Sequence, residues 1–284
     1  MFLRAALLTT LLLLPGIGDR FIYYPTKYPV GDWHPERAGL EVEERTLTSA
    51  DGVKIDAWWA PRAGARATIL FLHGNGGNLT NCTHALKRLA ERLDVNVFAV
   101  DYRGYGKSAG RPSEEGLYRD AEAAYAEVTG RLGLPAERLL IYGHSLGTAV
   151  ATELALRKRC AGLVLEAPFT SMREMVKRAV PFLDPDVLID ERYETVAKTP
   201  RLAMPLLVIH GTRDRTIPFE MGRAVFDAAH EPKTFLEVPG GGHVDCAVVA
   251  PDAFYGALKT FLDGALGAKA PSAAAKSERE PALF

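Results

Sequence analysis

Ser145 stands between two glycines in the stretch Gly143–Gly147, which reads GHSLG. The apolar run Leu139–Tyr142 precedes this stretch, and a helix-favouring run follows it. A sharp turn from a strand into a helix leaves no room for larger side chains beside the serine, and the G-x-S-x-G pattern at such a turn exposes a reactive hydroxyl. A plain tight turn would also need small residues, but the strand before and the helix after favour a nucleophile at Ser145.

A serine hydroxyl is a weak nucleophile until a nearby base takes its proton. Where this elbow occurs, an acid and then a histidine follow the serine along the chain. Three of the seven histidines lie downstream: His210 at the end of a predicted strand, His230 near the end of a charged helical stretch, and His243 in a glycine-rich loop. We predict that His243 is the base, because its loop follows the last strand and lets the imidazole reach Ser145. The alternative is a histidine on a surface loop.

The acid of such a site should be a carboxylate that follows a late strand. Asp214 comes shortly after the predicted strand Leu206–Ile209. Its role would be to fix the tautomer of His243 and to stabilise the imidazolium that forms. The alternative is that Asp214 only caps the following helix. Glu166 is the rival carboxylate, and we rank it lower because residues 167–169 lead the chain away into an insertion.

A second glycine-rich stretch, His73–Asn78 (HGNGGN), follows the apolar run Thr68–Leu72. Glycines allow backbone N–H groups to approach a ligand closely. The amide of Asn75 is therefore a candidate to stabilise negative charge on a reacting oxygen. The alternative is an ordinary turn between a strand and a helix.

A third glycine-rich stretch, Asp101–Ser108 (DYRGYGKS), ends in Gly-Lys-Ser like a phosphate-binding loop. That loop requires a glycine five residues before Gly106, and Asp101 stands there instead. The mismatch argues against nucleotide binding, and we expect a structural loop near the site.

Strand-like runs alternate with helical periodicity around these stretches. Two runs of alternating polarity, Val42–Thr48 and Val53–Ala60, predict an antiparallel hairpin. Six further strands are predicted at Thr68–Leu72, Val95–Val100, Leu139–Tyr142, Gly162–Leu165, Leu206–Ile209 and Thr234–Val238. Helices are predicted at His84–Leu93, Glu115–Leu132, Leu146–Lys158, Glu220–His230 and Asp252–Leu262. The order predicts an α/β fold with a mostly parallel eight-stranded sheet and helices on both faces, in which ligands bind beyond the carboxyl ends of the strands.

The two ends of the chain differ from its middle. Residues 1–18 carry one early positive charge and then an apolar run, which predicts a signal-anchor or a signal peptide and an extracytoplasmic domain; the alternative is a buried helix. Residues 265–284 are rich in Ala, Ser, Pro and charge, which predicts a disordered tail. Residues 19–264 form the predicted domain, and residues 168–204 are its predicted lid insertion.

The 34 basic and 35 acidic side chains nearly cancel, so charge gives no reason to expect nucleic acid as a partner. The three cysteines, Cys82, Cys160 and Cys246, are too widely spaced for a metal cage. We expect free thiols, and one disulfide stays possible if the domain is exported.

With these motifs in this order, the chain resembles the α/β-hydrolase superfamily over roughly residues 20–264. The motifs that carry the resemblance are His73–Gly77, Asp101–Gly106, Gly143–Gly147, Ala167–Ser171 and His210–Asp214. The chain is most similar to membrane-anchored serine hydrolases, in which a Phe-x-Tyr-x-Pro-like stretch follows an apolar segment; here it is Phe21–Pro25 (FIYYP). The resemblance implies a Ser145–Asp214–His243 triad and an oxyanion hole from the backbone amides of Asn75 and Leu146. Because the group includes depalmitoylases, lysophospholipid lipases and esterases, it implies acyl hydrolysis without naming a substrate.

The expected reaction is two-step acyl transfer from a small-molecule or lipid-like ester to water, with no metal or organic cofactor. Apolar side chains of the lid are candidates to line an acyl pocket, with packing against the sheet as the alternative: Met172, Met175, Val176, Val180, Phe182 and Leu183. Two other functions stay open, a serine peptidase of the same fold and a non-catalytic binding protein. The sequence says nothing about oligomeric state.

Overall fold

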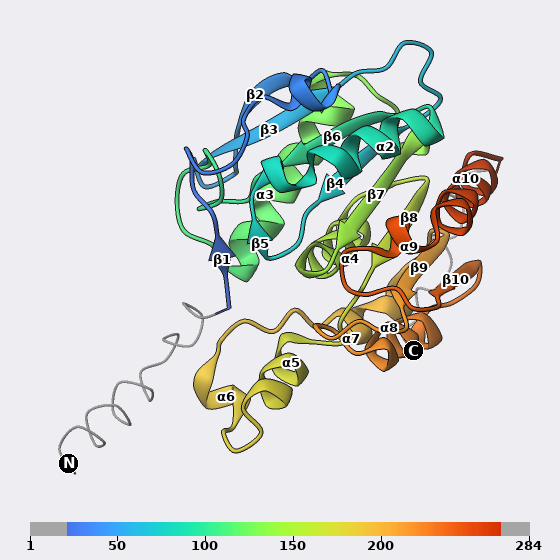
Figure 1. Cartoon of the computed structure of the whole chain (residues 1–284). Coiled ribbons are helices and arrows are strands. Elements are labelled where there is room, and N and C mark those ends of the chain that lie inside the picture. Colours follow the sequence, from blue (N-terminus) through green and yellow to red (C-terminus); the bar gives the residue numbers. More distant parts are fainter. Residues whose placement is uncertain (1–21, 268–284) are drawn as a thin grey trace, which may run out of the picture.

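A computed structural model describes residues 22–267, which form a sheet covered by helices (Figure 1). The sheet has eight strands in the order β10-β9-β8-β7-β4-β6-β3-β2. Their bounds are β2 Glu43–Thr48, β3 Lys54–Ala60, β4 Thr68–Leu72, β6 Asn96–Val100, β7 Leu139–His144, β8 Gly162–Glu166, β9 Leu206–Gly211 and β10 Lys233–Val238. In this spatial order, each strand from β10 through β4 to β6 is parallel to the next. Strand β3 is antiparallel to both β2 and β6. The predicted α/β class, with its mostly parallel eight-stranded sheet and leading hairpin, is confirmed.

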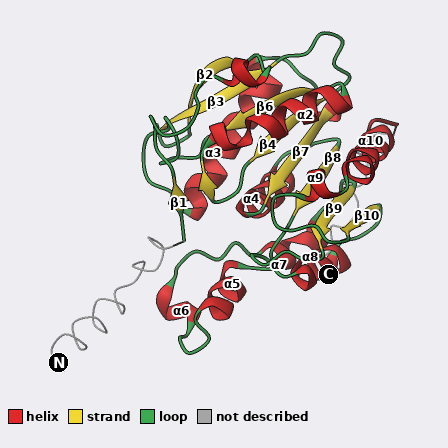
Figure 2. Ribbon diagram, viewed as in Figure 1, coloured by secondary structure: helices red, strands yellow, loops and turns green. Residues whose placement is uncertain are grey.

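Helices cover both faces of this sheet (Figure 2). The α-helices are α2 Thr83–Leu93, α3 Glu114–Ala126, α4 Leu146–Arg157, α5 Met172–Ala179, α6 Pro185–Leu188, α7 Thr195–Lys198, α8 Phe219–Ala228, α9 Cys246–Val249 and α10 Pro251–Gly267. Short turns of other helix types are η2 Pro35–Ala38, η3 Leu79–Cys82, η4 Glu127–Arg131, η5 Ala136–Arg138 and η6 Thr199–Arg201. Two apolar clusters are buried against the sheet. Helices α3, α4 and α8 contribute to the first apolar cluster, and α2 and α10 contribute to the second apolar cluster.

The central strands are apolar on both faces because both faces are covered. Every residue of β4 and β8 is buried, and five of the six residues of β7 are buried. Continuous apolar runs are typical of parallel strands between two helical layers. The edge strand β10 has only one buried residue, because it has a neighbouring strand on one side only.

The elements depart from the sequence expectations mainly at their ends. The helix expected at 115–132 ends at Ala126 and continues as the π-helical turn η4. Helix α10 continues to Gly267, three residues into the predicted tail, because Ala265 is buried in the second apolar cluster. Residues 1–21 and 268–284 lie outside the described residues, and so do the predicted anchor and most of the predicted tail.

Between residues 22 and 267, no helix is long and apolar enough to cross a membrane. The insertion at 168–204 folds into α5, α6, α7 and η6, and α5 and α6 lie apart from the sheet in Figure 1. A separate parallel pair of two-residue strands, β1 (Tyr24–Pro25) and β5 (Gly76–Gly77), joins the start of the described chain to the loop after β4.

Candidate active site

The turn between β7 and α4 holds Ser145 in a strained conformation. Its φ and ψ are +54° and −119°, a region that residues other than glycine rarely adopt. A Cβ at Gly147 would stand 2.0 Å from the carbonyl oxygen of Leu72, and one at Gly143 would stand 2.3 Å from the carbonyl oxygen of Gly147. Both glycines of the motif are therefore required by close backbone approach, as the sequence pattern predicts, and the geometry is that of a nucleophile elbow.

Three side chains from three loops meet at this turn. The Nε2 atom of His243 lies 2.9 Å from Oγ of Ser145, and its Nδ1 atom lies 2.7 Å from Oδ2 of Asp214. Ser145 follows β7, Asp214 follows β9 and His243 follows β10. Because these parallel strands end at one edge of the sheet, residues 98 positions apart come into hydrogen-bonding contact. The structure thus brings together the three residues that the sequence selects.

Asp214 is a fully buried carboxylate with every oxygen occupied. Its Oδ1 atom accepts hydrogen bonds from the backbone amides of Thr216 and Ile217, both at 2.8 Å, and Oδ2 faces His243 and His210. Burial alone would raise the pKa of Asp214, but the hydrogen bonds from His210, His243 and the amide of Ile217 outweigh it and hold this pKa well below its ordinary value. The carboxylate therefore stays ionised and orients the His243 ring.

The rival residues have other partners. Glu166 accepts a hydrogen bond from the hydroxyl of Tyr142 at 2.6 Å. His210 is buried, and its Nε2 atom lies 3.0 Å from the carbonyl oxygen of Ile217 and 3.4 Å from Oδ2 of Asp214, so it contacts the candidate acid but not Ser145. His230 is exposed just beyond α8. Among the residues from 22 to 267, only Asp214 and Ser145 have side chains within hydrogen-bonding distance of the His243 ring.

The loop after β4 passes directly beside Ser145. A Cβ at Gly74 would lie 3.3 Å from Cβ of Ser145, which places the next backbone amide, that of Asn75, at the turn. Within the described chain, no acceptor is recorded for the amide of Asn75. Leu146 begins α4, so its amide also lacks an intrahelical acceptor. These two amides are free to donate to an oxygen bound at Ser145.

The site contains one further polar contact that the sequence does not indicate. The Nε2 atom of His144 lies 3.1 Å from the backbone carbonyl oxygen of His243, so this ring donates to the loop that carries the candidate base. The contact joins the elbow to the loop after β10, across 99 residues. Its only sequence signal is the position of His144 next to Ser145, which does not reveal a partner so far along the chain.

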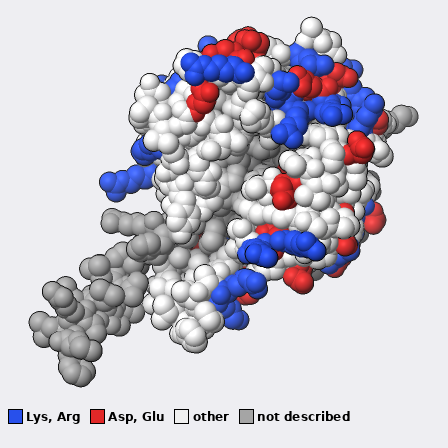
Figure 3. Space-filling view, in the orientation of Figure 1, with Lys and Arg blue, Asp and Glu red and all other residues white. Residues whose placement is uncertain are grey.

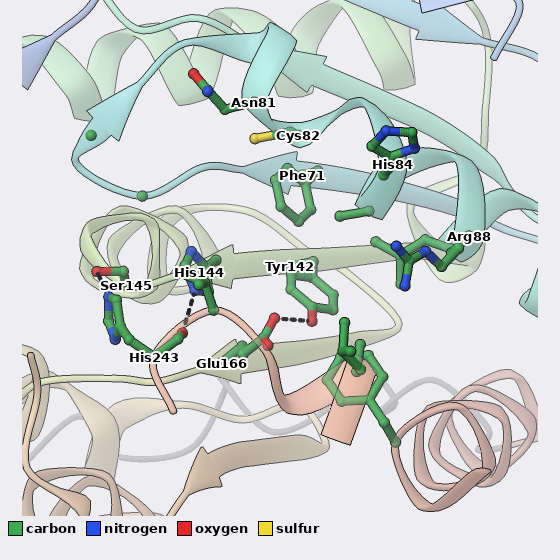
Figure 4. Close-up of a pocket in the computed structure, with 18 of the residues that line it drawn as sticks. Phe71, Asn81, Cys82, His84, Arg88, Tyr142, His144, Ser145, Glu166 and His243 are labelled. Carbon is green, nitrogen blue, oxygen red and sulfur yellow. Dashed lines mark hydrogen bonds between the residues drawn. The ribbon is translucent and has the colours of Figure 1, made fainter. Parts of the chain in front are cut away.

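A cavity of about 610 Å³ opens beside Ser145 and His243. Figure 4 shows Ser145 and His243 at one end, with Phe71, Tyr142 and Glu166 farther in and His84 and Arg88 at the opposite side. Its remaining walls are largely apolar, with Ala85 and Leu89 from α2, Ala247 and Val248 from α9, and Phe254 and Tyr255 from α10. The cavity therefore has largely apolar walls next to the serine hydroxyl, with Glu166 and Arg88 among its charged side chains.

The insertion does not line this cavity, so the acyl-pocket role considered for its apolar residues does not apply here and the alternative, packing, remains. Met172, Met175 and Val176 pack against the first apolar cluster instead. The side chain of Phe182 is 94% exposed, and Val180 and Leu183 are also exposed. The cavity instead lies on the side of the sheet that α2 and α10 cover.

The described part of the chain contains no cluster of three or more His, Cys, Asp or Glu side chains that could hold a metal ion. The three cysteines are free thiols. Figure 3 shows a broad uncharged area on this face, with basic and acidic side chains mixed around it. No single sign of charge dominates that face.

Comparison with known proteins agrees with the fold. Residues 63–185 match the family model described as serine aminopeptidase, S33. An uncharacterized protein of Mycobacterium tuberculosis is 34% identical over 86% of each chain, and the uncharacterized protein YfhR of Salmonella typhi is 31% identical over 95% of this chain and 96% of its own. The α/β-hydrolase domain-containing protein 17C of Xenopus tropicalis is 33% identical, covering 80% of this chain and 74% of that protein.

The chain belongs to the α/β-hydrolase superfamily, which these relatives and the eight-stranded fold define together. An esterase of Pyrococcus furiosus has a similar structure, with a TM-score of 0.70 over 87% of this chain and 98% of its own. Its sequence identity is 22%, so the likeness concerns the fold. The protein is thus an α/β hydrolase.

Proposed function

We propose that this hydrolase cleaves carboxylic ester or thioester bonds through an acyl-enzyme on Ser145. The observation that carries the proposal is the unbroken chain of hydrogen bonds from Ser145 through His243 to Asp214, at 2.9 and 2.7 Å. A serine activated in this way by a histidine with an oriented ring is equipped for acyl transfer.

The first step forms the acyl-enzyme. Nε2 of His243 takes the proton of Ser145 as Oγ attacks the acyl carbonyl carbon, and the negative charge develops on the carbonyl oxygen. The amides of Asn75 and Leu146 donate to that oxygen, and a donor of this kind contributes about 3 kcal/mol. His243 then passes its proton to the departing alcohol or thiol as the bond to the acyl carbon breaks.

The second step releases the acid. His243 takes a proton from water, whose oxygen attacks the acyl carbon of the ester on Ser145. The bond between that carbon and Oγ breaks, and His243 returns the proton to the serine. Asp214 stays ionised throughout and stabilises the imidazolium in both steps.

The cavity supports a small-molecule or lipid-like substrate. Its volume of about 610 Å³ and the apolar side chains of Phe71, Leu89 and Phe254 suit an uncharged chain or ring next to the ester. The esterase of Pyrococcus furiosus with the same fold supports ester chemistry on this scaffold. The name of the matching family model, serine aminopeptidase, makes peptide hydrolysis the second candidate.

A substrate panel tests the proposal. We expect p-nitrophenyl esters to be hydrolysed with a preference that changes with acyl length, and thioesters of matched acyl groups to be cleaved as well. The Ser145→Ala variant should lose both activities. Cleavage of amino-acid p-nitroanilides at rates above those of the esters would instead establish the peptidase.

We also propose that residues 1–18 hold the enzyme at a membrane or direct its export, so that the hydrolase domain works outside the cytoplasm. The support is the apolar run of the sequence that precedes the domain. Cell fractionation of the full chain beside a chain lacking residues 1–18 tests it. Recovery of both chains in the soluble cytoplasmic fraction would contradict it.

A further inference from the structure

The first described segment of the chain lies along the loop that carries Asn75. We call this segment the strap and define it as Ile22–Thr26. Tyr24 pairs with Gly76 and Pro25 with Gly77 in the parallel ladder of β1 and β5, and Figure 1 shows these two strands beside each other. The amide of Thr26 adds a hydrogen bond of 2.9 Å to the carbonyl oxygen of Gly77.

The side chain of Asn75 fastens its own loop to the strap. Its Oδ1 atom accepts hydrogen bonds from the backbone amide of Tyr24 at 3.2 Å and from the hydroxyl of Tyr105 at 2.8 Å. Its Nδ2 atom donates to the backbone carbonyl of Ile22. Two of these three bonds come from the strap, so the position of Asn75 depends on it.

The strap is itself fixed at several points. Ile22 and Tyr23 are buried in the first apolar cluster. The hydroxyl of Tyr23 lies 2.7 Å from the hydroxyl of Tyr193, which belongs to the insertion. Asn78 donates from Nδ2 to the carbonyl oxygen of Thr26 at 3.0 Å. The strap is therefore a packed part of the domain that touches both the Asn75 loop and the insertion.

We infer that the strap is a positioning element that holds the backbone amide of Asn75 where the reacting oxygen develops its charge. The inference rests on the proposed function. A donor of this kind stabilises a transition state only if it is already in place, and a displacement of about 1 Å can cost about 100-fold in rate. No hydrogen bond is recorded, among the described residues, between the strap and Ser145, His243 or Asp214, so activation of the nucleophile is separate.

Removing the hydrogen bonds of the Asn75 side chain should therefore lower kcat more than it changes KM. We expect Asn75→Ala, which keeps the amide and loses all three side-chain bonds, to lower kcat roughly 10- to 100-fold. Tyr105→Phe removes one bond and should give a smaller loss. The shape of the pH profile should not change in either variant, because the contact between Asp214 and His243 is kept.

The role of the buried residues that anchor the strap is tested with the Ile22→Ala/Tyr23→Ala double variant in the full chain. We expect this double variant to show the same loss of kcat. The matched control is Val30→Ala, at an exposed residue near the strap, which should keep the activity of the parent enzyme. Circular dichroism and thermal melting report whether each variant is folded. If the double variant does not fold, Asn75→Ala and Tyr105→Phe decide the question.

The outcomes separate this inference from the proposed function. If the parent enzyme hydrolyses esters and folded Asn75→Ala, Tyr105→Phe and strap variants keep kcat within about twofold, the positioning role is wrong and the hydrolase stands. If the parent enzyme cleaves no ester, thioester or amide and Ser145 resists a fluorophosphonate probe, the proposed function itself is wrong.

Discussion

Among the single residues of the candidate site, Asp214 is a buried carboxylate in contact with His243, and its rival Glu166 has no such contact. Asp214 satisfies both oxygens with two backbone amides and two imidazole rings. Glu166 also lies near the nucleophile, but its side chain is bonded to the hydroxyl of Tyr142. The amide of Ser145 does donate to the backbone carbonyl of Glu166 at 2.9 Å, a contact that any side chain at 166 would leave in place.

This arrangement predicts unequal effects of two conservative substitutions. Asp214→Asn keeps the size of the side chain but removes the charge that fixes the His243 tautomer, so kcat should fall roughly 10³- to 10⁴-fold. The matched variant Glu166→Gln should stay within about tenfold of the parent. Steady-state hydrolysis of one p-nitrophenyl ester measures both. A severe loss in Glu166→Gln with activity retained in Asp214→Asn would reverse the assignment of the acid.

At the scale of elements, the turn from β7 into α4 is the tightest backbone approach in the site. The space that a Cβ at Gly147 would need is already filled by the backbone at the end of β4, where the oxygens of Leu72 and His73 stand 2.0 and 2.7 Å away. Backbone cannot move aside as a flexible side chain can. The first turn of α4 therefore contacts β4 directly and fixes Ser145 over the sheet edge.

Gly147→Ala should consequently disrupt the elbow. We expect it to lower the free energy of unfolding by about 1–3 kcal/mol through overpacking and to reduce activity strongly. Gly256→Ala is the matched control, because Gly256 is an exposed helical glycine in α10 with no atom within 4 Å of the added Cβ. That control should be neutral or stabilising by up to about 1 kcal/mol. Urea unfolding and ester hydrolysis of both variants check the prediction, and equal behaviour would contradict it.

The sequence predicted the elements whose residues carry a local signal. Apolar runs such as Thr68–Leu72 mark strands covered on both faces, and the run before Ser145 marks the elbow. The contact of Tyr24 with Gly76 could not be predicted, because two-residue strands have no periodicity. The place of the cavity between α2 and α10, away from the insertion, depends on how distant helices pack and has no signature in any one segment.

At the scale of the whole molecule, one buried acid couples stability to pH. Asp56 in β3 is 7% exposed, and its Oδ2 atom lacks a hydrogen-bond partner among the described residues. Burial raises the pKa of Asp56 to about 7, with Asp101 and Glu44 adding to the shift and Lys107 opposing it. Between about pH 4 and pH 7, the folded state therefore holds a proton on Asp56 that the unfolded chain, in which this carboxyl has a pKa of about 3.9, has already lost.

Between about pH 4 and pH 7 the folded state binds more protons than the unfolded state, so this group makes stability fall as pH rises and then adds no further change. Asp56→Asn should remove that loss and stabilise the protein at pH 8 by about 2 kcal/mol or more, with little gain near pH 4. The exposed Asp227→Asn should change stability by less than about 0.5 kcal/mol. Urea unfolding at the two pH values measures both, and a gain that does not depend on pH would contradict the prediction.

An acyl-enzyme on Ser145 is tested by covalent labelling of the full-length protein with a fluorophosphonate, followed by intact-mass and peptide mass spectrometry. We expect one phosphonyl adduct, located on Ser145, that is absent from Ser145→Ala and forms much more slowly in His243→Ala. An unlabelled protein, or an adduct on any other residue, would contradict an acyl-enzyme on Ser145.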